Sequence, residues 1–186
     1  MVNRIDITSL DEYEQQKWAD LISSHIDQDM IKEHIRRFQE IHEVPLFFDW
    51  HSEKIQEMEN RIGKPLPIYY GTKEIPKAFM TFNESVIHDI PESDIPQLER
   101  RPPEDPGPFF SPPDRHETWI CPTLGFADLT DDSDTVCHDI MGHHADFHNL
   151  AQGILLGAGS PAAPIFYCYH VLHVDIYQDW KSCRFP

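Results

Sequence analysis

A group of histidines in residues 138–175 has a spacing that suits a metal ion. His144 and His148 stand four residues apart, which places both imidazoles on the same face of a helix. A loop rich in glycine, alanine, serine and proline follows, and a second apolar helical stretch then carries His170 and His173. Two histidines from one helix and a third from the next would form a three-nitrogen site, which zinc, copper, iron and nickel accept.

A second group of histidines lies upstream, where His34, His42 and His51 are spaced by eight and nine residues. A single histidine in an apolar stripe is more often a packed core residue or a surface residue than a ligand. Here both triplets are flanked by aromatic residues and helical periodicity, and the two together favour metal binding over that simpler interpretation. The sequence therefore predicts two histidine clusters in one chain, of which the upstream one either holds a second metal ion or serves acid–base chemistry.

Five stretches of the chain show helical periodicity and would position these histidines. The first opens at Thr8–Glu12, where Ser9 as N-cap and Glu12 three residues later fit a capping box. The remaining helices are expected at about 28–41, at about 50–62, from near Asp132-Ser133 to Ala151, and from Pro161 or Pro164 onward. This order predicts an all-α fold: an antiparallel four-helix bundle around a histidine-lined metal centre, with an extra N-terminal helix.

Residues 63–122 differ from the rest of the chain in composition, since twelve of the sixteen prolines lie there. Proline prevents both helix and central strand, so this stretch is irregular. A disordered linker is one interpretation. However, aromatic residues alternate with the prolines, and disordered linkers are poor in them, so we expect a long ordered loop that caps the helices and walls a pocket. With this loop included, residues 1–186 form a single domain.

The composition limits the partners of the chain. At 186 residues it is long enough for one domain with a substantial core. The net charge of −17 argues against nucleic acid and against anionic membranes, because both need a basic face. The start, MVNRIDITSL, lacks an apolar leader, and no stretch approaches the roughly 18 apolar residues of a membrane helix. We therefore expect a cytoplasmic protein whose four scattered cysteines are reduced.

The residues around both triplets resemble the metal motifs of the tyrosinase, catechol oxidase and haemocyanin (type-3 copper) family. The segment FFDWHSEKIQEMENRI is similar to the first motif, with an aromatic residue before Trp50-His51 and with Glu59 eight residues after the histidine. The segments HADFHN, SPAAPIF and HVLHVD together resemble the second motif. Its last histidine stands five residues before an aspartate, which is Asp175 in this chain.

This resemblance covers about residues 28–62 and 132–181, and it implies how the metals are held. Each helix pair of the family's four-helix bundle binds one metal ion through three histidine nitrogens. Carried over to this chain, the ligands are His34, His42 and His51 in the first site and His144, His148 and His170 in the second. Other branches of the family place the first ligand farther upstream, so His25 is the alternative to His34.

Several positions depart from the pattern of the oxidases in this family. Ser52 stands where an arginine usually follows the Trp-His pair, and Val171 follows the last ligand where a second histidine is common. Ala145 replaces the asparagine of monophenol-hydroxylating members, and Glu40 stands where a thioether-forming cysteine would be. These departures keep the metal ligands and argue against phenol oxidation.

A small chain with such departures resembles the fungal cyclopenases of quinolone-alkaloid biosynthesis. This resemblance implies zinc rather than a copper pair, and a non-oxidative lyase that acts on a small aromatic substrate. The implied reaction contracts the seven-membered ring of a cyclopenin-type benzodiazepinedione epoxide to a viridicatin-type quinolone and expels methyl isocyanate. Two other classes remain open: a dicopper o-diphenol oxidase that uses all six ligands, and a non-catalytic oxygen- or metal-binding protein.

Three further residues are candidates for the catalytic chemistry. His143 and His173 adjoin ligands, and either could act as a general base because histidine titrates near neutral pH. Asp175 either orients a ligand or caps a neighbouring helix. Four phenylalanines could stack on an aryl substrate, although core packing is their commoner role: Phe47, Phe48, Phe147 and Phe166. The sequence leaves the oligomeric state open.

Overall fold

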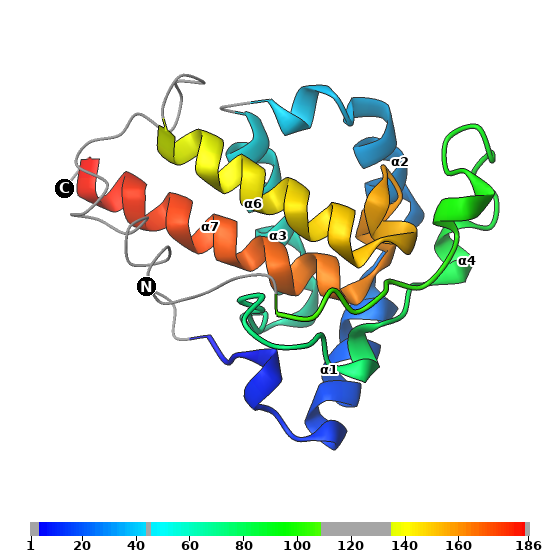
Figure 1. The fold of residues 1–186 in the computed structure, drawn as a ribbon, viewed down its shortest axis with the longest axis horizontal. Coiled ribbons are helices and arrows are strands. Elements are labelled where there is room, and N and C mark those ends of the chain that lie inside the picture. Colours follow the sequence, from blue (N-terminus) through cyan, green and yellow to red (C-terminus); the bar gives the residue numbers. More distant parts are fainter. Residues whose placement is uncertain (1–3, 44–45, 109–134, 185–186) are drawn as a thin grey trace.

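The fold is mostly helical. The computed structural model describes residues 4–43, 46–108 and 135–184. The α-helices are α1 (Glu12–His25), α2 (Gln28–Arg37), α3 (Leu46–Ile62), the short α4 (Glu84–Ile87), α6 (Thr135–Ala151) and α7 (Pro164–Arg184) (Figure 1). Within the described ranges no β-strand is present, and only Asp6 and Ile68 form an isolated parallel bridge. The all-α class predicted from the sequence is confirmed.

Short 3₁₀ turns connect the α-helices. They are η1 (Ile7–Ser9), η2 (Glu40–His42), η3 (Lys77–Phe79), η4 (Gln97–Glu99), η5 (Gly153–Leu156) and η6 (Ser160–Ala162). The turns η5 and η6 lie between α6 and α7, in the loop rich in small residues. This loop therefore reverses the chain direction between the two helices that carry the downstream histidines.

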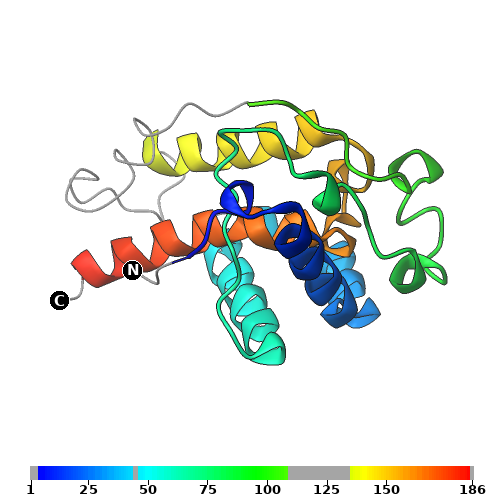
Figure 2. The same ribbon diagram turned by 90° about the horizontal axis from the view of Figure 1, so that it is seen from below.

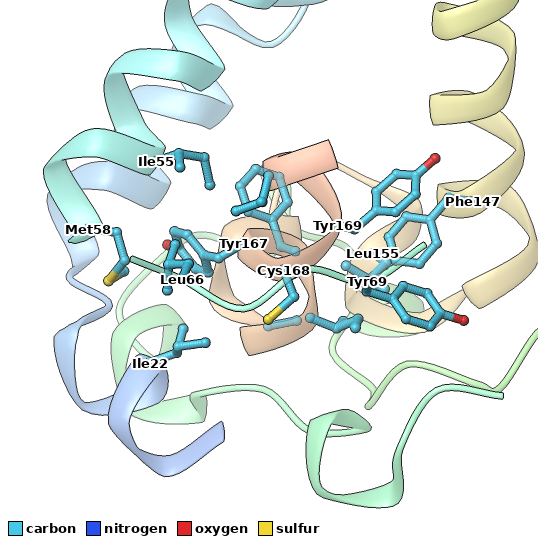
Figure 3. Packing of buried hydrophobic residues seen from close by; sticks show 14 of the residues in the cluster. Ile22, Ile55, Met58, Leu66, Tyr69, Phe147, Leu155, Tyr167, Cys168 and Tyr169 are labelled. Atoms are coloured by element: carbon cyan, nitrogen blue, oxygen red, sulfur yellow. The ribbon is translucent and has the colours of Figure 1, made fainter. Parts of the chain in front are cut away.

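Helix α7 runs through the core of the molecule. Figures 1 and 2 show α6 and α7 side by side and running in opposite directions, while α3 crosses α7. Every residue from 165 to 174 is buried, as expected for a helix that other elements surround. In Figure 3, Tyr167 lies on the side of Ile55 of α3, whereas Tyr169 stacks on Phe147 of α6 with ring centroids 3.8 Å apart.

The start of α1 differs from the prediction. Asp11, not Ser9, is the N-cap, because its side chain accepts a hydrogen bond from the backbone N–H of Glu14 at 2.8 Å. Ser9 lies in η1, where its hydroxyl donates to the carbonyl oxygen of Asp6 at 2.7 Å. The capping box predicted from Ser9 and Glu12 is therefore wrong, since the preceding turn already uses the Ser9 hydroxyl.

The boundaries of α2 and α3 also differ from those predicted. Helix α2 ends at Arg37, and the N–H of Phe38 bonds to the carbonyl of Ile35, an i→i−3 bond that tightens the last turn. His42 consequently lies on η2 rather than at the edge of an α-helix. Helix α3 begins at Leu46, four residues before the predicted start, so the aromatic residues before His51 are helical too.

The proline-rich segment is ordered over residues 63–108. Gly63 ends α3 in the left-handed region with φ of 78°, and farther on the N–H of Tyr69 donates to the carbonyl oxygen of Cys168 at 2.9 Å. Buried side chains anchor the rest of the segment: Leu66, Ile68, Ile75, Phe79, Ile87, Ile90 and Ile95. That the whole segment 63–122 forms an ordered cap stays a prediction. Residues 109–122, and the expected helix start at 132–133, lie outside the described residues.

The side chain of Arg4 joins α3 to α7. Its Nε donates to both carboxylate oxygens of Asp175 on α7 at 3.0 Å, and its Nη1 is paired with the carboxylate of Glu59 on α3. The same Nη1 donates to the carbonyl oxygen of Leu66 at 3.0 Å, and only 5% of the Arg4 side chain is exposed. These contacts of Arg4, Glu59 and Asp175, called the Arg4 clamp below, hold together two helices that carry ligand candidates.

Candidate metal centre

The first histidine triplet predicted from the sequence comes together in the interior of the fold. His34 on α2, His42 on η2 and His51 on α3 each place a ring nitrogen within 4.8 Å of the other two. The alternative candidate, His25, belongs to no such group among the described residues. It lies in the last turn of α1, where its Nδ1 is 2.8 Å from the carbonyl oxygen of Leu21. The structure thus groups His34, and not His25, with the other two candidates.

The second group differs from the predicted triplet. It consists of His51, His144 and His170, whose ring nitrogens also lie within 4.8 Å of one another. The Nε2 atoms of His144 and His170 are 3.0 Å apart, and the rings of His51 and His170 stack at 4.6 Å with an interplanar angle of 12°. His148 lies alongside, with its ring centroid 4.5 Å from that of His144, but it is in neither group of three. Its role as a ligand stays a prediction.

Backbone carbonyl groups orient five of these six rings. Each of the five places its Nδ1 between 2.6 and 2.7 Å from a carbonyl oxygen. The pairs are His34 with Ala158, His42 with Phe38, His51 with Phe47, His148 with Leu155, and His170 with Phe166. A carbonyl oxygen can only accept, so each Nδ1 carries the proton and donates it. The lone pair of the neutral ring then lies on Nε2.

Three of these Nε2 atoms face no hydrogen-bond donor among the described residues. The Nε2 atoms of His34, His51 and His148 are buried and have no hydrogen-bond partner among the described residues. Folded proteins pair most buried polar atoms, because an unpaired one costs roughly 1–3 kcal/mol. Buried lone pairs that converge in this way indicate a site for a metal cation, with Nδ1–H held by an outer partner as in known metal sites.

Burial keeps the imidazoles neutral. Desolvation, reinforced by neighbouring imidazoles, lowers the pKa of His34, His51, His144 and His170 well below the usual 6.5. Burial also lowers the pKa of His148 to about 4. A metal ligand must be deprotonated at the coordinating nitrogen, so these rings are in the form that binds a cation at neutral pH.

The loop between α6 and α7 supplies two of the orienting carbonyls, those of Leu155 and Ala158. It starts with two consecutive left-handed residues, Gln152 with φ of 50° and Gly153 with φ of 54°. A side chain at Gly153 would place its Cβ 2.2 Å from the carbonyl oxygen of Pro102, so only glycine fits. This turn brings the loop carbonyls back against the histidines of α2 and α6. The sequence analysis did not identify these two carbonyls.

A pocket of about 250 Å³ opens onto the metal centre. His42, His144 and His148 form part of its wall. The other lining residues are mostly apolar: Phe38, Met141, Ala145, Asn149, Leu155, Leu156, Gly157 and Ser160. Small-molecule sites are typically apolar concavities with a few polar groups, and their volumes start near roughly 300 Å³. This pocket therefore suits a small and largely apolar molecule.

The three residues predicted as catalytic have different surroundings. The Nδ1 of His143 lies 2.7 Å from the hydroxyl oxygen of Tyr169. His173 is buried, and neither of its ring nitrogens has a hydrogen-bond partner within the described part of the chain. Asp175 belongs to the Arg4 clamp. None of the three lines the pocket at the metal centre, and their catalytic roles stay predictions.

The aromatic residues considered as substrate contacts pack in the core instead. All four are buried: Phe47, Phe48, Phe147 and Phe166. Phe166 stacks on His170 with ring centroids 3.9 Å apart, and Phe47 lies 4.4 Å from the ring of His51. They pack against the rings of the ligand candidates, and none of them lines the pocket. The aromatic wall of the pocket is Phe38, which the sequence analysis did not single out although it lies four residues before His42.

Comparisons with known proteins assign no family to the chain. Searches against protein-family models, curated proteins and solved structures each found no match. A test for membrane spans found no described helix with the length and apolarity needed to cross a bilayer. The histidine centre and its pocket are therefore the features that indicate a function.

Proposed function

We propose that this chain is a metalloenzyme whose histidine centre binds zinc. The observation that supports the proposal is the set of buried Nε2 atoms that converge without hydrogen-bond partners among the described residues. Histidines packed for structure alone would pair these nitrogens. The carbonyl partners at Nδ1 leave the opposite nitrogen free, which is the arrangement that metal ligation requires.

The side chains around the centre suit both the metal and a reaction. A zinc ion bound by three imidazoles keeps a coordination position open and polarises a carbonyl or epoxide oxygen. The neutral rings offer nitrogen ligands without a prior loss of protons at pH 7. Phe38 and Met141 give the pocket apolar walls, and Asn149 and Ser160 give it two groups that can hydrogen-bond to a substrate.

The reaction that we propose is the non-oxidative lyase reaction of the cyclopenases. A cyclopenin-type benzodiazepinedione epoxide would lose methyl isocyanate and contract to a viridicatin-type quinolone. The size and apolar lining of the pocket support a small aromatic substrate. Ala145, one of the departures from the phenol oxidases, lies in the pocket wall and offers no hydrogen bond there.

The alternative function is a dicopper o-diphenol oxidase. Its support is the presence of all six predicted ligands around one centre, with the rings of His42 and His144 only 5.4 Å apart. Such an arrangement brings nitrogen donors from both triplets close enough for two neighbouring metal ions. Copper binds nitrogen ligands more strongly than zinc, so the donors alone do not select the metal. A non-catalytic oxygen- or metal-binding protein is the second alternative.

We further propose the antiparallel four-helix bundle and a cytoplasmic location. In this bundle α2, α3, α6 and α7 carry five of the six ligand candidates, and η2 carries His42. The opposite directions of α6 and α7 support the bundle (Figure 1). Cys168 is a free and fully buried thiol, which fits a reducing compartment.

The test combines metal content with turnover. The full chain would be purified without added metal, analysed for bound elements, and assayed under anaerobic conditions with a cyclopenin-type epoxide. We expect one zinc per chain and quinolone formation without dioxygen. The control is His88→Asn, because the His88 side chain is 81% exposed and lies in neither histidine group. This variant should match the unmodified chain in both measurements.

Two other outcomes would change the assignment. Two copper ions per chain, with dioxygen uptake in the presence of catechol, would make the oxidase the function and exclude the lyase. A chain that binds no metal after incubation with zinc or copper would rule out both enzymes. In either case the zinc lyase is abandoned.

A further inference from the structure

His51 is the one residue that the two histidine groups share. It lies within 4.8 Å of His34 and His42 in one group and within 4.8 Å of His144 and His170 in the other. Its Nδ1 donates to the carbonyl of its own helix, so only Nε2 has a lone pair. One lone pair binds one metal ion at a time. The two groups therefore compete for His51.

The group with His144 and His170 has the closer donors. The Nε2 atoms of these two residues are 3.0 Å apart. Two imidazoles on a tetrahedral zinc, at about 2.05 Å from the metal, stand roughly 3.3 Å apart, so a few tenths of an ångström of movement would suffice. Without a metal ion this approach is a hydrogen bond: His170 carries its proton on Nδ1, so its Nε2 accepts from the Nε2–H of His144. Zinc binding at both Nε2 atoms would replace this bond and place the His144 proton on Nδ1. The ring of His51, which stacks on that of His170, adds a third nitrogen donor from α3.

The geometry points to a single zinc site formed by His51, His144 and His170. This site, called the mixed site below, takes one ligand from each of α3, α6 and α7. It differs from a site built on α6 and α7 alone, since His51 takes the place of His148. The inference rests on the proposed zinc binding, and it names which residues hold the first metal ion.

The packing supports the choice of His51 over His148. His51 and His170 are both at most 1% exposed, and each is fixed by a carbonyl of its own helix. His148 is only partly buried as a residue, is fixed by the loop carbonyl of Leu155, and lines the pocket. With zinc in the mixed site, His148 remains free to contact a molecule bound in the pocket. His34 and His42 are then left with two donors, which is too few for a second tight site.

The test compares two variants of the full chain, His51→Asn and His148→Asn. Asparagine keeps an N–H near the position of Nδ1 but has no counterpart of Nε2, so the bond to the backbone carbonyl is preserved in both variants. Zinc affinity would be measured by competition with a chelator, and bound zinc by elemental analysis. Far-ultraviolet circular dichroism would confirm that both variants keep their helices.

The mixed site makes opposite predictions for the two variants. His51→Asn should lower zinc affinity more than about 100-fold, beyond the loss expected for an outer partner, whereas His148→Asn should change it less than about threefold. The reverse pattern, equal loss in both variants, or no loss in either would overturn the mixed site while zinc binding by the unmodified chain still stands. Absence of zinc binding in the unmodified chain would overturn the proposed function as well.

A third variant tests the site without relying on the fold of His51→Asn. The triple variant His34→Asn/His42→Asn/His148→Asn keeps only the mixed-site ligands among the six. It should still bind one zinc per chain. Failure to bind zinc with retained helix content would overturn the inference.

Discussion

The two sides of the metal centre differ in how firmly they are built. On one side, α3 and α7 enclose His51 and His170, and the Arg4 clamp ties the two helices together. On the other side, α6 carries His144 and His148, which line a pocket. The two histidines of the first side are fully enclosed, whereas the second side is open to a small molecule.

This difference would separate two tasks of the proposed metalloenzyme, holding the metal ion and admitting a substrate. The α3–α7 side is further fixed by the Tyr177 hydroxyl, which donates to the Asp49 carboxylate at 2.5 Å. Such a rigid side can hold ligands in place. The α6 side exposes Ala145 and Asn149 at the pocket, where a substrate would need access. We therefore expect changes on the α3–α7 side to act on stability and metal binding, and changes at pocket residues other than the ligand candidates to act on substrate binding.

The largest expected effect is the loss of stability at low pH, because protonation affects the buried histidines on both sides of the metal centre. The zinc-free chain should lose stability steeply as the pH falls below about 6.5. The pKa of each deeply buried histidine is lower in the folded chain than the 6.5 of the unfolded chain, so the unfolded state takes up protons first. Each such histidine lowers the free energy of unfolding by about 1.4 kcal/mol for every pH unit below 6.5. Urea unfolding at pH 7.5, 6.5 and 5.5 measures this loss.

The histidine origin of this acid effect can be checked with one buried and one exposed histidine variant. His148→Asn should make the pH dependence shallower between pH 6.5 and about 4, because that is the interval between its unfolded and folded pKa. The exposed His88→Asn variant should follow the unmodified chain. A zinc-free chain whose stability stayed constant from pH 7.5 to 5.5 would contradict the assignment of neutral buried rings.

The second prediction concerns the Arg4 clamp. Arg4→Met should destabilise the chain by about 2–3 kcal/mol, because it leaves the carboxylates of Glu59 and Asp175 without their buried cation. The estimate lies below the value for a fully buried pair, since 16–20% of each carboxylate side chain is exposed. The measurement is urea denaturation at pH 7.5, with zinc removed.

The matched control for the clamp is Arg101→Met. Arg101 pairs with Glu104 at 3.4 Å on the surface, with 47% and 59% of the two side chains exposed. Exposed pairs contribute at most about 1 kcal/mol, so this variant should unfold within roughly 0.5 kcal/mol of the unmodified chain. Equal effects of the two arginine variants would show that the α3–α7 side is not specially fixed.

The sequence predicts the local parts of this architecture better than the long-range ones. The spacing of His144 and His148 on one helical face follows from helix geometry, and both lie on α6. That His51 joins His144 and His170 depends on how three helices meet, which spacing within one helix does not encode. Arg4 illustrates the same limit. Its partners lie 55 and 171 residues away in sequence, so no local pattern marks it as the link between two ligand helices.

The smallest expected effect lies in the pocket wall. Leu156 is 37% exposed and lines the pocket, so Leu156→Ala removes apolar contact with a bound molecule but little of the core. A pocket contact of this size changes substrate binding by roughly 1 kcal/mol, and the KM should rise about fivefold. Zinc affinity should stay unchanged, because no ligand or orienting carbonyl belongs to this residue. Leu98→Ala, at a position 67% exposed and outside the pocket, is the control and should leave the KM unchanged. A fall in zinc affinity in Leu156→Ala would show that the apolar wall of the pocket supports metal binding, beyond the one ligand, His144, that α6 contributes to the mixed site.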